Sequence, residues 1–183
     1  LPRMGLIASE GIFDFMNEVL PVKNFSALRL PFAAVATDLG TGEQVTIPTG
    51  SIARAVQASC SLPLVFTPPV GRRRPLVDGG VASMIPVRSL REELGAKKAV
   101  AVNVNDKDGA AGSCDNLLKI AVQVSTLWAK SNAREEEKLA DVVVPVSAVG
   151  IALYDLTKTA ELLKRGRAAA EKSLPAIRRL LDA

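Results

Sequence analysis

Two short segments of this chain are apolar almost without interruption, and they constrain the fold more than any other feature of the sequence. They are residues 98–104 and residues 141–146. A strand with one wet face alternates apolar and polar residues, whereas runs like these are typical of strands covered on both faces. Segments with helical spacing lie between and beside them. The sequence therefore predicts a layered α/β domain with a largely buried sheet.

The other elements are predicted from apolar spacing and from the prolines and glycines that interrupt it. A hairpin is expected from residues 32–37 and 43–47, and a further short strand from residues 75–77. Helices are expected over residues 11–20, 52–59, 87–94 and 115–139, and from residue 155 to the end.

Three of these helices carry more specific expectations. In the second, Ser51 or Thr49 caps the first turn, and the shared apolar face consists of Ile52, Ala55, Val56 and Ser59. In the fourth, Trp128 is expected in the core. In the last, the packing face is expected to hold Ala170, Leu174, Ile177 and Leu181, with the basic residues opposite. Pro175 either kinks that helix or begins a second segment.

Length and terminal sequence bear on domain organisation. A chain of 183 residues is the size of one compact domain, and no apolar run is long enough for a transmembrane helix. The chain opens on Leu1 without an initiator Met or a signal-peptide pattern. We therefore expect residues 1–183 to be a piece of a longer product.

The absence of histidine excludes several kinds of active site. With no His in the sequence, a Ser-His-Asp triad, a Cys-His dyad and any His-containing zinc site are impossible within this chain. Cys60 and Cys114 are too few for a four-cysteine metal cluster or a disulfide framework. Burial in the core is the expectation for both, which favours a reducing, cytoplasmic location.

Net charge and aromatic content limit the partners. The net charge is +4, and the basic residues cluster at residues 72–74 and 164–179. With one Trp, one Tyr and five Phe there is no aromatic interleaving to stack bases, so no nucleic acid is expected as a partner. Contact with anionic lipid headgroups, at the periphery of a membrane, fits the same charges.

The tripeptide Asp78-Gly79-Gly80 follows the short strand at residues 75–77. It places a carboxylate at the carboxyl end of a strand, where ligands of open α/β sheets bind. The same tripeptide also makes an ordinary turn, and Asp38 in the hairpin loop is interpreted as a turn residue of that kind. Spacing alone leaves both interpretations of Asp78 open.

Three blocks of sequence decide between them. Residues 30–43 read LPFAAVATDLGTGE, residues 55–66 read AVQASCSLPLVF, and residues 76–87 contain LVDGGV and IPV. In this order they resemble the carboxyl-terminal half of bacterial patatin-like phospholipases, and the helical tail also fits. The resemblance implies a three-layer α/β/α sandwich around a mostly parallel, buried central sheet. Residues 1–183 would then be the carboxyl-terminal part of a single patatin-like domain, with the sheet incomplete.

The resemblance also implies a chemistry that does without histidine. The family's members are lipid acyl hydrolases, phospholipases or carboxylesterases, that use a Ser-Asp dyad. Asp78 matches the catalytic aspartate, which would act as proton acceptor, and Gly79 and Gly80 would shape the turn that presents it. A lipid ester is the implied substrate, and no metal or organic cofactor is implied. The basic residues and the apolar stretch at residues 63–70 are candidates for contact with the lipid surface.

The sequence departs from the family at the nucleophile. No glycine in the 183 residues begins a G-x-S-x-G motif, and no glycine-rich oxyanion loop precedes the blocks. Ser59, Cys60 and Ser61 are unsuited to replace it, because the carboxyl end of a helix disfavours an anionic nucleophile. The chain by itself is therefore expected to be inactive, with its serine in a longer form.

Two further expectations follow from the missing half. The alternative function is a non-catalytic module that binds an acyl chain or a partner protein. A sheet lacking its first strands would also expose an apolar edge and face, which predicts self-association.

Overall fold

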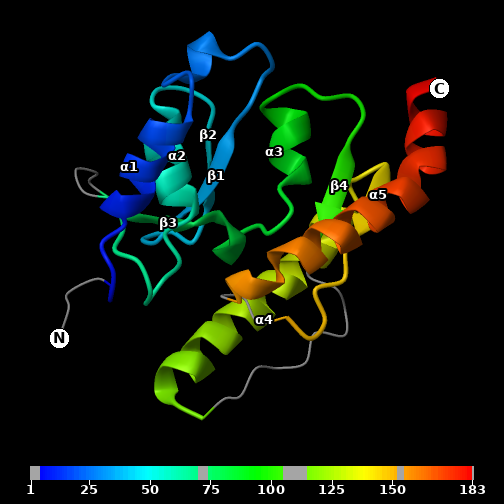
Figure 1. Ribbon diagram of the computed structural model, residues 1–183. Helices are drawn as coiled ribbons and strands as arrows, with labels where there is room; N and C mark the ends of the chain where they lie inside the picture. Colours follow the sequence, from blue (N-terminus) through cyan, green and yellow to red (C-terminus); the bar gives the residue numbers. More distant parts are fainter. Residues whose placement is uncertain (1–4, 70–73, 105–114, 152–154, 183) are drawn as a thin grey trace.

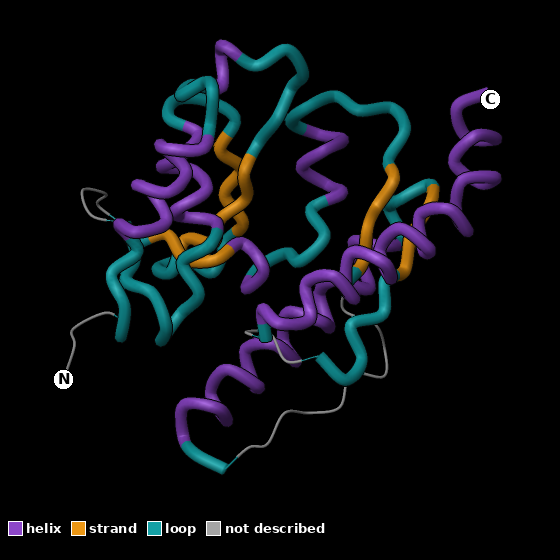
Figure 2. The backbone as a smooth tube through the Cα atoms, viewed as in Figure 1, coloured by secondary structure: helices purple, strands orange, loops and turns teal. Residues whose placement is uncertain are grey.

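The computed structural model describes residues 5–69, 74–104, 115–151 and 155–182. The architecture is mixed α/β, as the sequence predicts, with two small sheets in separate parts of the molecule (Figures 1 and 2). We call residues 5–83 the antiparallel region and residues 84–182 the parallel region, after the sheet that each contains. The expected single, mostly parallel sheet of a three-layer sandwich is not confirmed by the described residues.

The antiparallel region is built on a three-stranded sheet of order β2-β1-β3. The expected hairpin is confirmed as β1 (Ala34–Asp38) and β2 (Gln44–Ile47), and β3 (Leu76–Asp78) pairs antiparallel with the other edge of β1. The loop between β1 and β2 forms because Asp38 Oδ1 accepts hydrogen bonds from the amides of Gly40 (2.8 Å) and Thr41 (3.2 Å). Asp38 is thus a turn residue, as predicted.

The helix α2 (Ile52–Ser59) packs on this sheet, and α1 (Glu10–Val19) packs on α2. Phe25 of the 3-10 turn η1 (Phe25–Ala27) joins the same core. Ser51 caps α2 by accepting from the Arg54 amide, so Ser51 rather than Thr49 is the cap. The buried face of α2 is wider than predicted and includes Gln57, because α2 packs on the sheet on one side and on α1 on the other.

The parallel region follows a second 3-10 turn, η2 (Gly79–Val81). Its sheet pairs β4 (Val100–Asn103) with β5 (Val142–Pro145) in parallel. The remaining elements are α3 (Val87–Glu92), α4 (Leu117–Glu137), the 3-10 turn η3 (Leu156–Lys158) and α5 (Thr159–Asp182). The long α4 and α5 run diagonally past this sheet (Figure 1), and α5 packs on β5.

The expectation that the strand at residues 98–104 is covered on both faces is wrong. Val100 is 39% exposed, Val102 57% and Val104 53%, while the alternating Ala101 is buried. Polar and apolar residues do not alternate along residues 98–104, so the sequence gives no sign that one face of the strand is exposed. The two sheets do not join, and Val100 and Val102 of β4 line a cavity that is bordered on other sides by α3 and by Val35 of β1.

The packing face of α5 is also different from the predicted one. Leu174 is 41% exposed and Leu181 is 67% exposed, and Ala170 is exposed as well, while Ile177 is half-buried. The residues turned toward the domain include Leu162, Ala169, Ser173 and Leu180. The helix contains Pro175 without ending there, and its axis turns in its last part (Figures 1 and 2), which agrees with the predicted kink.

Candidate active site

The predicted acid, Asp78, closes β3 and is held by its backbone on three sides. It pairs with Ala36 in the sheet, its amide donates to the Ser61 carbonyl (3.0 Å), and its carbonyl accepts from Thr37 Oγ1 (2.9 Å). Its own carboxylate then turns back, with Oδ1 accepting from the Gly80 amide (2.7 Å). Strand pairing and local turn geometry together fix the direction of this carboxylate.

Gly79 and Gly80 are both required by close approach. A Cβ on Gly79 would overlap the backbone carbonyl of Val35 in β1. A Cβ on Gly80 would lie 2.9 Å from Asp78 Oδ1 and so would push the carboxylate aside. The predicted role of the two glycines in shaping the turn therefore has a steric basis.

Thr37 is a site residue that the sequence analysis missed. Its side chain is buried, and Oγ1 donates to the Asp78 carbonyl while accepting from the Ala82 amide (3.1 Å). It therefore joins both ends of the η2 turn. A threonine in an apolar strand is ordinary β-sheet composition, so the sequence offers no signal for this role.

A buried polar network supports the loop that carries the Ser61 carbonyl. Ser61 Oγ donates to the Gln57 carbonyl (2.6 Å), and Gln57 Nε2 donates to Ser9 Oγ (2.9 Å). Arg54 donates to Gln57 Oε1 (3.0 Å) and lies over the Phe13 ring. Gln57, Ser9 and Ser61 have no exposed surface, so this network fixes the carboxyl end of α2 against α1.

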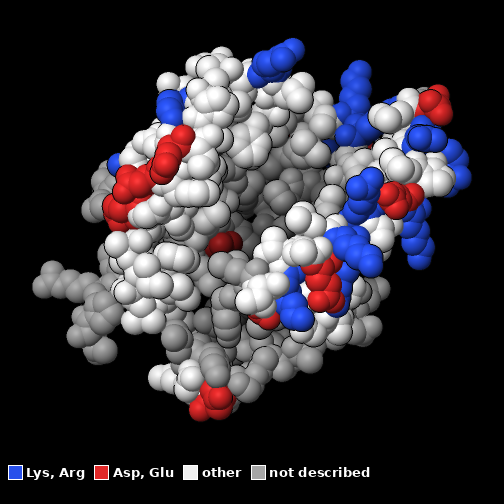
Figure 3. Space-filling view, in the orientation of Figure 1, with Lys and Arg blue, Asp and Glu red and all other residues white. Residues whose placement is uncertain are grey.

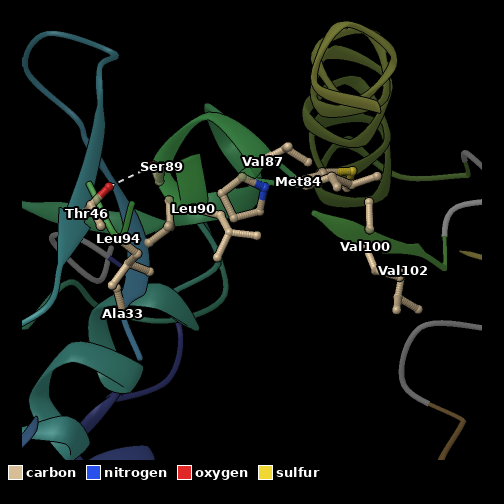
Figure 4. Close-up of a pocket in the computed structure, with 13 residues that line it drawn as sticks. Ala33, Thr46, Met84, Val87, Ser89, Leu90, Leu94, Val100 and Val102 are labelled. Carbon is tan, nitrogen blue, oxygen red and sulfur yellow. Dashed lines mark hydrogen bonds between the residues drawn. The ribbon is translucent and has the colours of Figure 1, made fainter. Parts of the chain in front are cut away.

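Asp78 lies on the wall of a cavity of about 410 Å³. Ser59, Gly80 and Ser83 line it beside Asp78, and the rest of the lining is mainly apolar. A second cavity of about 250 Å³ shares Ala33, Val35, Met84 and Pro86 with the first and extends to Val100 and Val102 of β4 (Figure 4). The face in Figure 3 is hollowed between the two regions, and an acidic group lies inside the hollow.

The electrostatics of Asp78 suit a base. Burial raises the pKa of its carboxyl above the ordinary value, and the hydrogen bond from Gly80 opposes that rise to a smaller extent. A carboxylate with a raised pKa holds a transferred proton more readily than a solvated one. Perturbed groups of this kind inside a cavity are typical of functional sites.

None of Ser59, Cys60 and Ser61 is suited to replace the missing nucleophile. Ser61 makes a helix-end hydrogen bond to the Gln57 carbonyl, and Ser59 lines the Asp78 cavity. Cys60 is exposed, so its predicted burial is wrong: it is the residue directly after α2, where the chain leaves the helix. Partial removal of its thiol from water, and then the charge of Asp78, raise the thiol pKa, which disfavours the reactive thiolate.

Several predicted positions fall outside the described residues or on side chains that are not described. Cys114, Arg72 and Arg73 lie outside the described ranges, and the side chain of Trp128 in α4 is not described. Arg74 is described, with an exposed side chain and an ion pair to Asp38 (3.7 Å).

The described residues contain neither a cluster of metal-ligating side chains nor a helix suited to span a membrane. Within residues 5–69, 74–104, 115–151 and 155–182, no three His, Cys, Asp or Glu side chains gather as metal ligands would. Among the helices so described, none combines the length and apolarity needed to cross a bilayer.

Comparison with known proteins adds a family. A model of the patatin-like phospholipases matches residues 2–91. Uncharacterised NTE family proteins of Mycobacterium bovis and of two strains of Mycobacterium tuberculosis are each 30% identical to the chain over 139 residues. That match covers 75% of this chain and 37% of each relative, so the chain spans well under half the length of the curated relatives it matches.

Proposed function

Because this chain belongs to the patatin-like phospholipase family through residues 2–91, we propose that it supplies the aspartate of a Ser-Asp dyad in a lipid acyl hydrolase. The observation that carries the proposal is Asp78. It has a raised pKa, a backbone held on three sides and a place on the wall of a largely apolar cavity. The serine comes from outside these 183 residues, which form the carboxyl-terminal part of a single patatin-like domain. Strands from the rest of that domain complete the sheet.

The proposed reaction is acyl transfer to serine and then to water. As the serine oxygen attacks the ester carbonyl carbon, Asp78 accepts the hydroxyl proton, and it passes that proton to the alkoxide when the C–O bond to the alcohol breaks. In the second half, Asp78 takes a proton from water as that water attacks the acyl-serine, and returns it to the serine. Every proton is accounted for by one carboxylate, without histidine.

Substitution of Asp78 in the complete gene product tests the proposal. Asp78→Asn preserves the acceptor for the Gly80 amide but removes the base, so hydrolysis of a short-chain chromogenic ester should fall roughly 10³-fold. Asp38→Asn is the matched control, because this aspartate accepts only local amides in a turn and pairs with exposed Arg74. Turnover of Asp78→Asn near the wild-type rate would contradict the proposal.

A second candidate function is a module that binds an acyl chain or a partner without turnover. The absence of a G-x-S-x-G motif from the sequence favours it, and the apolar cavity could hold a chain without any chemistry. The hydrolase forms a covalent bond from its serine during the reaction, and the binding module does not. An active complete gene product whose serine is phosphonylated by a fluorophosphonate with loss of fluoride, detected by intact mass, fits only the hydrolase.

We also propose that α5 contacts an anionic lipid surface. Leu163, Leu174 and Leu181 are 70%, 41% and 67% exposed and fall on one stripe of the helix. On a helical projection, Lys164, Arg167 and Arg178 lie along one side of that stripe, and basic side chains gather over this part of the surface (Figure 3). An exposed apolar stripe beside basic residues is the pattern of helices that lie in a membrane interface.

Vesicle sedimentation tests this surface. Binding to vesicles with phosphatidylserine should exceed binding to pure phosphatidylcholine and should weaken at high salt. Leu163→Ser with Leu181→Ser should reduce it several-fold. Leu30→Ser, which changes a 78% exposed leucine in the antiparallel region, should not. Equal binding by all variants would contradict the assignment to α5.

A further inference from the structure

One buried hydroxyl in the described structure has no partner. Ser83 is 5% exposed, and its Oγ is the single buried side-chain nitrogen or oxygen among the described residues without a hydrogen bond. Its neighbours differ: Thr37 Oγ1 makes two hydrogen bonds and Ser61 Oγ makes one. Buried polar groups are nearly always paired, so an exception in a native fold calls for an explanation.

The Ser83 backbone is held as firmly as that of Asp78. The Ser83 amide donates to the Gly79 carbonyl (2.8 Å). The preceding residue, Ala82, donates its amide to Thr37 Oγ1 and accepts from Asn132 Nδ2 of α4 (3.2 Å). Thr37 therefore holds both Asp78 and Ala82, the residue before Ser83, in place. The hydroxyl is left unpaired although its backbone is held in place.

Ser83 lines the same cavity as the acid, but its Oγ has almost no exposed surface of its own, so the hydroxyl meets the cavity only after rotation about the Cα–Cβ bond. Asp78, Ser59 and Ser83 supply the polar side chains of the 410 Å³ cavity, and the other side chains that line it are apolar. An ionised carboxylate accepts hydrogen bonds but donates none. A ligand oxygen that enters this cavity therefore needs a donor. Ser59 lies in the last turn of α2, where the helix carbonyls are within reach of a serine hydroxyl, which leaves Ser83 as the donor without a competitor.

We propose that Ser83 is a substrate-binding residue, whose side chain rotates toward the cavity when a lipid ester binds beside Asp78, so that its Oγ–H donates a hydrogen bond to a carbonyl oxygen of that ester. This inference rests on the proposed function and adds to it the group that recognises the ester itself. It explains why the ligand-free protein keeps an unpaired hydroxyl in an apolar wall. A few placed polar groups orient ligands in cavities of this kind.

Binding of an ester and its ether analogue tests the inference. The probes are dihexanoylphosphatidylcholine, below its micelle concentration, and the dialkyl ether that lacks both carbonyl oxygens. The complete gene product is used, with the serine that the fluorophosphonate labels replaced by alanine so that the ester is not consumed. We expect the wild type to bind the ester roughly 3- to 10-fold more tightly than the ether, the size of one net hydrogen bond. Ser83→Ala should bind both equally.

Two controls separate recognition from structural damage. Ser59→Ala removes the other hydroxyl of the cavity and should retain the preference for the ester. In thermal melting, Ser83→Ala should keep or raise the Tm, because it removes an unpaired buried hydroxyl, whereas Ser61→Ala should lower it. A preference for the ester that persists in Ser83→Ala overturns the role of Ser83 alone. Failure of the wild type to bind either lipid overturns the lipid function and this role together.

Discussion

The antiparallel and parallel regions hold their strands in different ways. The antiparallel core is the larger of the two and combines four alanines with four larger side chains, among them Phe25, Ile52 and Leu76. The parallel core is made largely of alanines, Ala99, Ala101 and Ala133, with Ile85 and Val87. Polar contacts supplement it: Arg91 donates to the Leu139 carbonyl and pairs with Asp141 (2.8 Å), which also accepts from the Ala99 amide (2.7 Å).

The antiparallel region holds the candidate site in place, whereas the parallel region leaves part of β4 exposed. In the antiparallel region, strand pairing and a buried hydrogen-bond network hold the Asp78 turn in place. In the parallel region, packed alanines and the ion pair between Arg91 and Asp141 hold β4 but leave Val100 39% and Val102 57% exposed. The family match to residues 2–91 covers the first kind of region and ends in α3.

The largest contrast between the regions should come from one added methyl group. Gly79→Ala would force the chain against the Val35 carbonyl and should cost about 2–4 kcal/mol of stability. Gly166→Ala in α5 meets nothing within 4 Å and should instead add roughly 0.5–1 kcal/mol through helix propensity. Urea denaturation of the two variants measures both signs. Equal effects would remove the distinction between the regions.

A matched valine pair tests burial. Val77→Thr places a hydroxyl in the core of the antiparallel region, where the side chain is 1% exposed, and should cost about 1–3 kcal/mol. Val102→Thr, at 57% exposure, should change the stability of the monomer by less than about 0.5 kcal/mol.

The same pair also bears on self-association, which we propose occurs through the open face of β4. Sedimentation velocity should show concentration-dependent association of the wild type that Val102→Thr reduces and Val77→Thr does not. Monomeric wild type at all concentrations would rule out that association.

The pH dependence of stability should identify Asp78 as a destabilising charge. Its raised pKa means that the folded state holds the proton more tightly than the unfolded state, so stability from this group is complete below the ordinary value of 3.8 and is lost as pH rises through the folded pKa. Asp78→Asn removes that loss. Its Tm should therefore exceed the wild-type Tm at neutral pH, and the difference should shrink in acid. A variant less stable than the wild type at pH 7 would contradict the assigned sign.

The smallest expected effect concerns Cys60. The Asp78 charge contributes to the raised pKa of the thiol, so Asp78→Asn should lower that pKa and speed alkylation by iodoacetamide at pH 8, by less than 10-fold. A Cys114→Ser background confines the reaction to one thiol. An unchanged alkylation rate would place Cys60 too far from Asp78 for their charges to interact.

The sequence was a good guide to local structure. The hairpin, the strand before Asp78 and the helices at α1, α2, α3, α4 and α5 agree with predictions from apolar spacing, because propensity and turn chemistry act over a few residues. The turn role of Asp38 and the tight turn at Gly79 and Gly80 were predictable for the same reason.

Side-chain environments were less predictable. The exposure of Cys60 and of Leu181, the burial of Gln57 and the two links made by Thr37 depend on which elements pack together. Each residue type is ordinary in its own element, so no local pattern distinguished it.

By itself, then, the sequence determined the order of the elements, the exclusion of histidine chemistry and the position of Asp78 at the end of a strand. Only the tertiary structure decided that the strands form two sheets, that β4 has an open face, and that Ser83 lies unpaired beside Asp78. The physical reason is the distance along the sequence over which each kind of interaction acts. Backbone conformation is set largely by neighbours along the chain, whereas burial and hydrogen-bond pairing are set by residues far away in sequence that the fold brings together.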